Sequence, residues 1–165
     1  MTDQQNKENC VDSEYYPTWL GQSLLEDDFP WQDASVYSVQ EFLEKYSLHD
    51  SSWVTIYYDV AYDAQATLVI SWDPFWLPDG IATKTDAVFD WPLLFIKLEG
   101  VKQISTSGYE DLEGMPRGIG TAEVEMREDR FVFVINDHYG GSVEIIFGGT
   151  AQILAFNRNK QPLRI

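Results

Sequence analysis

The chain has 165 residues, of which 27 are Asp or Glu and 11 are Lys or Arg, giving a formal net charge of −16. Nucleic acid and anionic membranes would be repelled by this charge, and no apolar run approaches the roughly 20 residues of a membrane span, so neither is expected as a partner. With one cysteine, Cys10, and no signal-peptide pattern at the start, the sequence predicts a cytoplasmic protein without internal disulfides.

The length favours one folded domain over residues 15–165, preceded by a flexible polar tail over residues 1–14. A short helical turn is predicted near residues 20–25. All of the excess negative charge belongs to residues 1–113, because residues 114–165 carry equal numbers of acidic and basic side chains.

The first strong pattern is an amphipathic helix at residues 39–46. Ser38 and Glu41 have the spacing of a capping box, and apolar side chains recur at helical spacing from Val39 to Tyr46. We expect this helix to lay one face on a sheet.

From residue 48 the apolar period changes to two, which indicates strands. The fold class predicted is α+β, with a mostly antiparallel β-sheet of six to eight strands and one or two short helices packed on it. Consecutive strands should be largely adjacent. The expected strands cover residues 53–58, 66–72, 93–98, 101–105, 122–127, 131–136, 142–147 and 151–157.

Alternation near the C-terminus predicts which side chains share a face of the sheet. One face should be buried and hold Phe131, Phe133, Ile135, Ile145 and Phe147. The opposite face should hold Val132, Val134 and Val143.

The two histidines limit catalytic proposals. His49-Asp50 and Asp137-His138 could together supply metal ligands, but two dipeptides carry little specificity. The favoured interpretation is that Asp50 and Ser51 close a turn and that His49 hydrogen-bonds locally. The two imidazoles should then lie more than about 6 Å apart, with no metal and no cofactor.

Other catalytic patterns are weak. Cys10 has no neighbour that would activate its thiol, and no serine lies in a nucleophile elbow. Residues 115–120 look like a glycine-rich phosphate loop but lack its lysine, and a strand follows where a helix is needed. Pairs of carboxylates arise by chance among 27 acidic residues. The sequence therefore predicts a protein without catalytic residues.

Residues 72–92 form a long connection between two predicted strands, with three prolines and four aspartates. Two interpretations stay open: its aromatic rings anchor a partner, or Trp72, Phe75, Trp76 and Trp91 cover one end of the sheet. We expect a negative, partner-binding face. Its candidate residues are Asp73, Phe75, Trp76, Asp79, Asp86, Asp90, Glu110, Asp111 and Glu113.

Three segments follow the helix in a familiar order. Residues 48–56 read LHDSSWVTI, residues 68–73 read LVISWD, and residues 94–104 read LFIKLEGVKQI. Over residues 38–157 this pattern resembles the small acidic immunity-type proteins of bacterial polymorphic toxin systems. The resemblance implies a protein that binds and neutralises a cognate toxin and has no catalytic residues.

Charge and resemblance point to the same class of function. An acidic inhibitor suits a basic partner, because opposite charge accelerates association and fixes orientation. We expect a cytoplasmic immunity protein that occludes a basic toxin domain. The alternatives are a non-catalytic ligand- or protein-binding sheet domain and, third, a hydrolase that uses acidic residues; the charge could also serve solubility alone.

Overall fold

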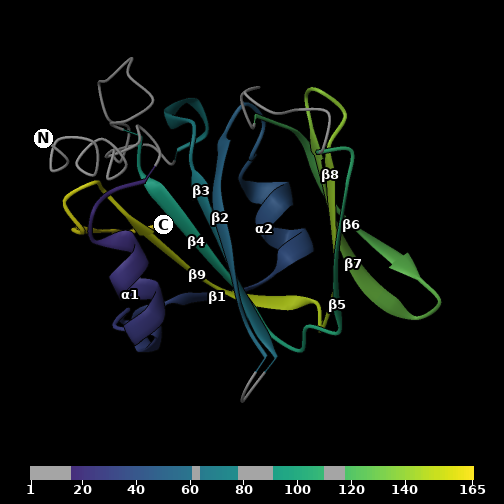
Figure 1. Ribbon diagram of the computed structural model, residues 1–165, viewed down its shortest axis with the longest axis horizontal. Helices are drawn as coiled ribbons and strands as arrows, with labels where there is room; N and C mark the ends of the chain where they lie inside the picture. The colour runs from purple at the N-terminus through teal and green to yellow at the C-terminus, as the bar shows by residue number, and fades with distance from the viewer. Residues whose placement is uncertain (1–15, 61–63, 78–90, 110–117) are drawn as a thin grey trace, which may run out of the picture.

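The computed structural model describes residues 16–60, 64–77, 91–109 and 118–165, which form two antiparallel sheets. The larger sheet has the order β1-β9-β4-β3-β2, with β10 also paired to β9, and the smaller has the order β5-β8-β7-β6. Helix α2 lies between the sheets, whereas α1 covers the other face of the larger sheet (Figure 1). The strands are β1 (Ser35–Ser38), β2 (Ser52–Asp59), β3 (Gln65–Ser71), β4 (Leu93–Leu98), β5 (Gln103–Ser107), β6 (Ile119–Arg127), β7 (Arg130–Asp137), β8 (Ser142–Phe147), β9 (Thr150–Phe156) and β10 (Pro162–Leu163).

The predicted α+β class with mostly antiparallel pairing is confirmed, but six to eight strands was too low, since the described part of the chain has ten. The two strands that the sequence did not indicate are β1, of four residues, and β10, of two. Both pair with β9 and are too short for an alternating pattern to stand out. The strands are also divided between two sheets: β8 pairs with β5 and β7 in the smaller sheet, whereas β9 pairs with β4 in the larger one.

Helix α2 (Val39–Lys45) begins where the sequence predicts. The Ser38 hydroxyl accepts a hydrogen bond from the Glu41 N–H at 3.1 Å, which satisfies one of the free donors at the helix start. Val39 and Phe42 are fully buried between the sheets. This helix therefore fills the space that the two sheets enclose.

Helix α1 (Leu20–Glu26) confirms the predicted helical turn near residues 20–25. It buries Leu20 and Leu24 against the other face of the larger sheet. Two short 3-10 turns, η1 (Trp31–Asp33) and η2 (Pro74–Trp76), lie outside the sheets. The predicted polar tail, residues 1–14, lies outside the described residues.

Both faces of the larger sheet are covered, so its central strands read as nearly continuous apolar runs. Strand β8, by contrast, alternates between buried and half-buried positions. The inner cluster joins α2 to both sheets, and it includes Phe42, Leu68, Trp72, Ile96, Phe133, Ile145 and Ile153. The outer cluster lies against α1, and it includes Leu20, Leu24, Phe29, Val69, Phe95 and Phe156.

Two of the predicted side-chain positions on β7 and β8 are wrong. Phe131 is 37% exposed, because it sits opposite Phe147 in the terminal pair of the β7–β8 ladder. Val143 pairs directly with Ile135 and belongs to the same inner cluster, so it does not face the other way. Phe133, Ile135, Ile145 and Phe147 are buried together as predicted, and Val132 and Val134 are buried outside that cluster.

No helix within the described ranges is long and apolar enough to cross a membrane.

Candidate functional site

The short connection between α2 and β2, residues 46–51, is held by hydrogen bonds from several segments. The Trp72 indole N–H donates to the Ser47 carbonyl at 2.9 Å, and the His49 N–H donates to the Ser47 hydroxyl at 3.1 Å. Asp50 has a left-handed backbone with φ of 63°, a conformation that aspartate tolerates better than most residues. Its N–H donates to the Ile119 carbonyl at 2.9 Å, which ties the connection to β6.

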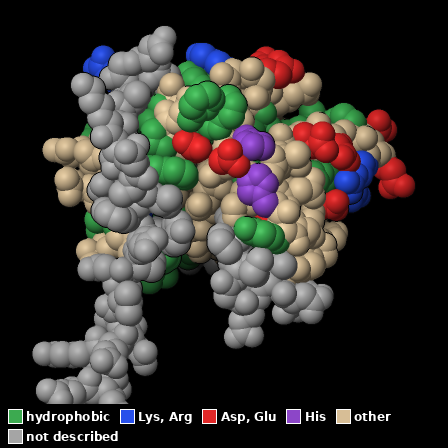
Figure 2. Space-filling model, turned by 90° about the horizontal axis from the view of Figure 1, so that it is seen from above, with side chains coloured by type: hydrophobic (Ala, Val, Ile, Leu, Met, Phe, Trp, Pro, Cys, Tyr) green, Lys and Arg blue, Asp and Glu red, His purple; other side chains and the backbone are tan. Residues whose placement is uncertain are grey.

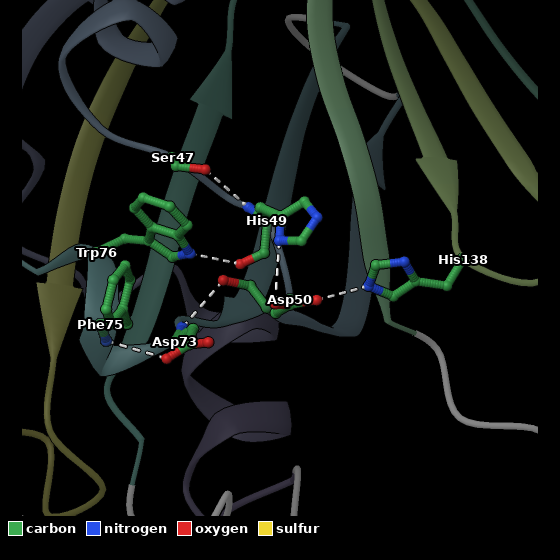
Figure 3. Close-up of polar contacts among 8 residues, drawn as sticks. Ser47, His49, Asp50, Asp73, Phe75, Trp76 and His138 are labelled. Atoms are coloured by element: carbon green, nitrogen blue, oxygen red, sulfur yellow. Dashed lines mark hydrogen bonds and ion pairs between the residues drawn. The ribbon is translucent and has the colours of Figure 1, made fainter.

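A second rigid segment lies beside this connection. In η2, the Asp73 carboxylate accepts from the Phe75 N–H at 3.0 Å, and Pro74 occupies the first position of the turn. The Trp76 indole N–H donates to the His49 carbonyl at 2.8 Å, and the Asp73 N–H donates to the buried Ser51 hydroxyl at 2.9 Å. These bonds fix the turn against the α2–β2 connection (Figure 3).

His138 comes from the smaller sheet, directly after β7. Its N–H donates to the Gly118 carbonyl at 3.0 Å, and its ring lies over the first residues of β6. A Cβ atom at Gly118 would lie 2.9 Å from the ring carbon Cδ2, and one at Gly120 would lie 3.2 Å from Nδ1. A side chain at Gly118 would therefore displace the imidazole, and one at Gly120 would require it to shift by a few tenths of an ångström.

The two histidines converge on one carboxylate. His138 Nε2 lies 2.8 Å from Asp50 Oδ1, and His49 Nδ1 lies 3.0 Å from Asp50 Oδ2. The imidazole centroids are 5.4 Å apart, and the rings are nearly perpendicular at 83°. Figure 3 shows Asp50 between the two rings. The bond from Asp50 to His138 links the two sheets across one end of the molecule.

We call this end of the molecule the His–Phe face; it consists of His49, Asp50, Asp73, Phe75, Trp76 and His138. Figure 2 views this end, with the two histidines side by side next to acidic side chains and a hydrophobic patch close by. The side chains of His49, Asp50 and His138 are 49%, 54% and 37% exposed. Phe75 is 79% exposed, although the Trp76 ring packs against it at 4.7 Å.

Three of the predicted partner-binding residues are described, and they lie together. Asp73, Phe75 and Trp76 belong to η2 and its cap, beside the connection between α2 and β2 (Figure 3). Trp72 is fully buried, as the interpretation that these rings cover the sheet predicts, whereas Phe75 is exposed. The remaining candidates lie outside the described residues: Asp79, Asp86, Asp90, Glu110, Asp111 and Glu113.

The predicted separation of the histidines is wrong. They were expected more than about 6 Å apart, but 5.4 Å separates the ring centroids. Asp137, the other carboxylate of the two dipeptides, does not join them: it is 6% exposed and accepts from the Tyr139 N–H at 2.9 Å. Asp137 is therefore buried whereas its neighbour His138 is exposed, because successive side chains along a strand point to opposite faces.

Sequence reasoning missed the supporting residues of this face. Gly118 and Gly120 leave space for the His138 ring, and the Ile119 carbonyl accepts a hydrogen bond from the Asp50 N–H. The available signal was a pair of glycines, one residue apart, at the start of a strand. Because glycine weakens a strand, such a pair indicates a site where another group approaches closely.

Comparison with protein-family models, with curated proteins and with solved structures gives no match.

Proposed function

We propose that this protein is a non-catalytic inhibitor that binds a basic protein partner, a toxin domain, through the His–Phe face. The observation that carries the proposal is Phe75, a large apolar side chain left 79% exposed on a turn that is otherwise firmly held. Single exposed apolar residues are common on protein surfaces. Phe75 combines this exposure with a backbone held in place by Pro74, Asp73 and Trp76.

Phe75 lies on a turn that several neighbouring groups hold in place. Proline at the first position, the Asp73 cap and the Trp76 bond to the His49 carbonyl all restrict the turn before any partner arrives. A group that is already ordered loses little conformational entropy on binding, so more of its contact energy contributes to affinity. Aromatic anchors of this kind commonly dominate interface energetics.

Charge supports the choice of a basic partner. The carboxylates of Asp50 and Asp73 flank the aromatic side chains, and the whole chain has a net charge of −16. Opposite charge on a partner would steer encounters toward this face and orient the complex. The resemblance to immunity-type proteins supports a toxin as that partner.

The experiment has two stages. The natural chain is used to capture partners from the organism that encodes it, and mass spectrometry identifies them. The purified partner is then assayed for toxic activity with and without the chain. Dose-dependent loss of that activity would support the proposal; a captured partner that is acidic or unaffected by the chain would contradict it.

Replacing Phe75 by alanine tests the anchor. Phe75→Ala should raise the dissociation rate of the complex about tenfold or more, since a buried aromatic anchor is worth roughly 2 kcal/mol. Its free energy of unfolding should change by no more than about 0.5 kcal/mol, because the side chain is exposed. Binding kinetics and urea denaturation measure the two effects.

Leu25→Ala is the matched control. Leu25 is 74% exposed on α1, which covers the opposite side of the larger sheet. Its replacement should leave both quantities unchanged. Equal dissociation rates for the natural chain and Phe75→Ala would show that the interface lies elsewhere.

A further inference from the structure

We propose that His49, Asp50 and His138 form a binding site for one divalent transition-metal cation of the Zn²⁺ class. Each of the three residues offers one ligand atom, and these atoms all lie within 4.8 Å of one another. Among the described residues no other group of three histidine, cysteine or acidic side chains meets this condition. The proposal goes beyond the binding function above and needs no partner protein.

The donor atoms select the kind of cation. Two imidazole nitrogens and one carboxylate oxygen suit Zn²⁺, Co²⁺ and similar ions, whereas Mg²⁺ and Ca²⁺ prefer oxygen ligands throughout. In a tetrahedral zinc site, bonds of about 2.0–2.1 Å place the ligand atoms about 3.4 Å apart. The two imidazole nitrogens contact different oxygens of Asp50, at 2.8 and 3.0 Å. One ligand atom from each residue already lies within 4.8 Å of the other two, so rotations of these side chains must bring the three atoms about 1 Å closer together.

The backbone around these side chains is fixed in advance. Asp50 is held in its left-handed conformation by the hydrogen bond to Ile119, and Trp76 holds the His49 carbonyl. Gly118 and Gly120 leave room that the His138 ring fills. A site whose supporting residues are ordered before the metal arrives binds more tightly than one that must be assembled.

Exposure leaves the metal accessible. The three side chains are 37–54% exposed, so an ion can enter and its remaining coordination positions stay open to water. The strong negative charge of the chain raises the local concentration of cations and helps capture. Chemically, the result is an open three-ligand site on the same end of the molecule as Phe75.

The test is titration of the purified, metal-free chain with Zn²⁺ by calorimetry, and with Co²⁺ by visible absorption. The natural chain should bind one equivalent of either ion and bind Mg²⁺ at least tenfold more weakly. Asp50→Asn and His138→Asn should each weaken Zn²⁺ binding about tenfold or more. Asn tolerates the left-handed backbone at position 50, so the first variant should keep its fold.

Two controls separate this site from general attraction to acidic residues. Asp129→Asn removes a carboxylate in the turn between β6 and β7, at the other end of β7 from His138, and Cys10→Ser removes the only thiol of the chain; neither should change the affinity. Gly118→Ala keeps all three ligands but displaces His138, so it should weaken binding. Near-ultraviolet circular dichroism checks that each variant is folded.

Two results would overturn the proposal. One is that the natural chain binds no stoichiometric Zn²⁺, or binds it no better than Mg²⁺. The other is that folded Asp50→Asn and His138→Asn bind Zn²⁺ as the natural chain does. Either result would leave the proposed recognition of a basic partner standing, because that proposal is tested by Phe75→Ala and the partner itself.

Discussion

At the scale of single residues, three neighbouring aromatic side chains have three different roles. Trp72 is fully buried and packs against Phe42 and Tyr46, at 6.1 and 5.7 Å between ring centroids. Trp76 is half-buried and fixes the His49 carbonyl, whereas Phe75 is exposed. The sequence identified this segment but could not assign the roles, because they depend on where the chain between β3 and β4 turns.

Trp72→Ala should therefore destabilise the fold strongly. It would leave a large cavity between α2 and the larger sheet and would leave the Ser47 carbonyl without its indole donor. We expect the free energy of unfolding to fall by about 3–5 kcal/mol, measured by urea denaturation. A loss below about 1 kcal/mol would mean that the ring is not part of the core.

The meeting of His49 and His138 is the other residue-level result that the sequence could not provide. Each histidine was visible as a neighbour of an aspartate, yet their approach depends on hydrogen bonds between residues far apart in the chain. Asp50 contacts Ile119, and His138 contacts Gly118, so β6 brings both together. No pattern of neighbouring residues in the sequence indicates that His49 and His138 meet.

At the scale of elements, prediction succeeded where one local signal decided the outcome. The capping pair Ser38 and Glu41 located the start of α2, and strands β4 and β8 match their expected ranges. It failed for β1 and β10, whose strand conformation comes from pairing with β9. The sequence also could not show that the strands form two sheets, because the alternation of apolar and polar residues along a strand is the same in either sheet.

The cap of α2 makes a quantitative prediction. Ser38→Ala removes the acceptor of the Glu41 N–H and should lower the free energy of unfolding by about 1 kcal/mol. Ser38→Thr retains a hydroxyl acceptor and should cost less. Thermal and urea unfolding of both variants measure the difference; equal losses for the two would show that the cap does not stabilise this helix.

At the scale of the whole molecule, several of the basic side chains are engaged internally. Arg127 lies 2.7 Å from Glu125 and 3.0 Å from Glu144, and these carboxylates raise the pKa of its guanidinium, Glu144 more than Glu125. Lys160 lies 2.9 Å from Asp28, and hydrogen bonding to Lys160 lowers the pKa of that carboxyl. These two basic side chains are therefore matched by nearby carboxylates, and the chain keeps its formal net charge of −16.

The measurement that tests the account most directly is the association rate of the captured partner with the natural chain at two salt concentrations. Between about 50 and 300 mM salt, screening shortens the reach of charge attraction, so the association rate should fall about tenfold or more, while the dissociation rate changes little. An association rate independent of salt would contradict electrostatic recognition of a basic partner.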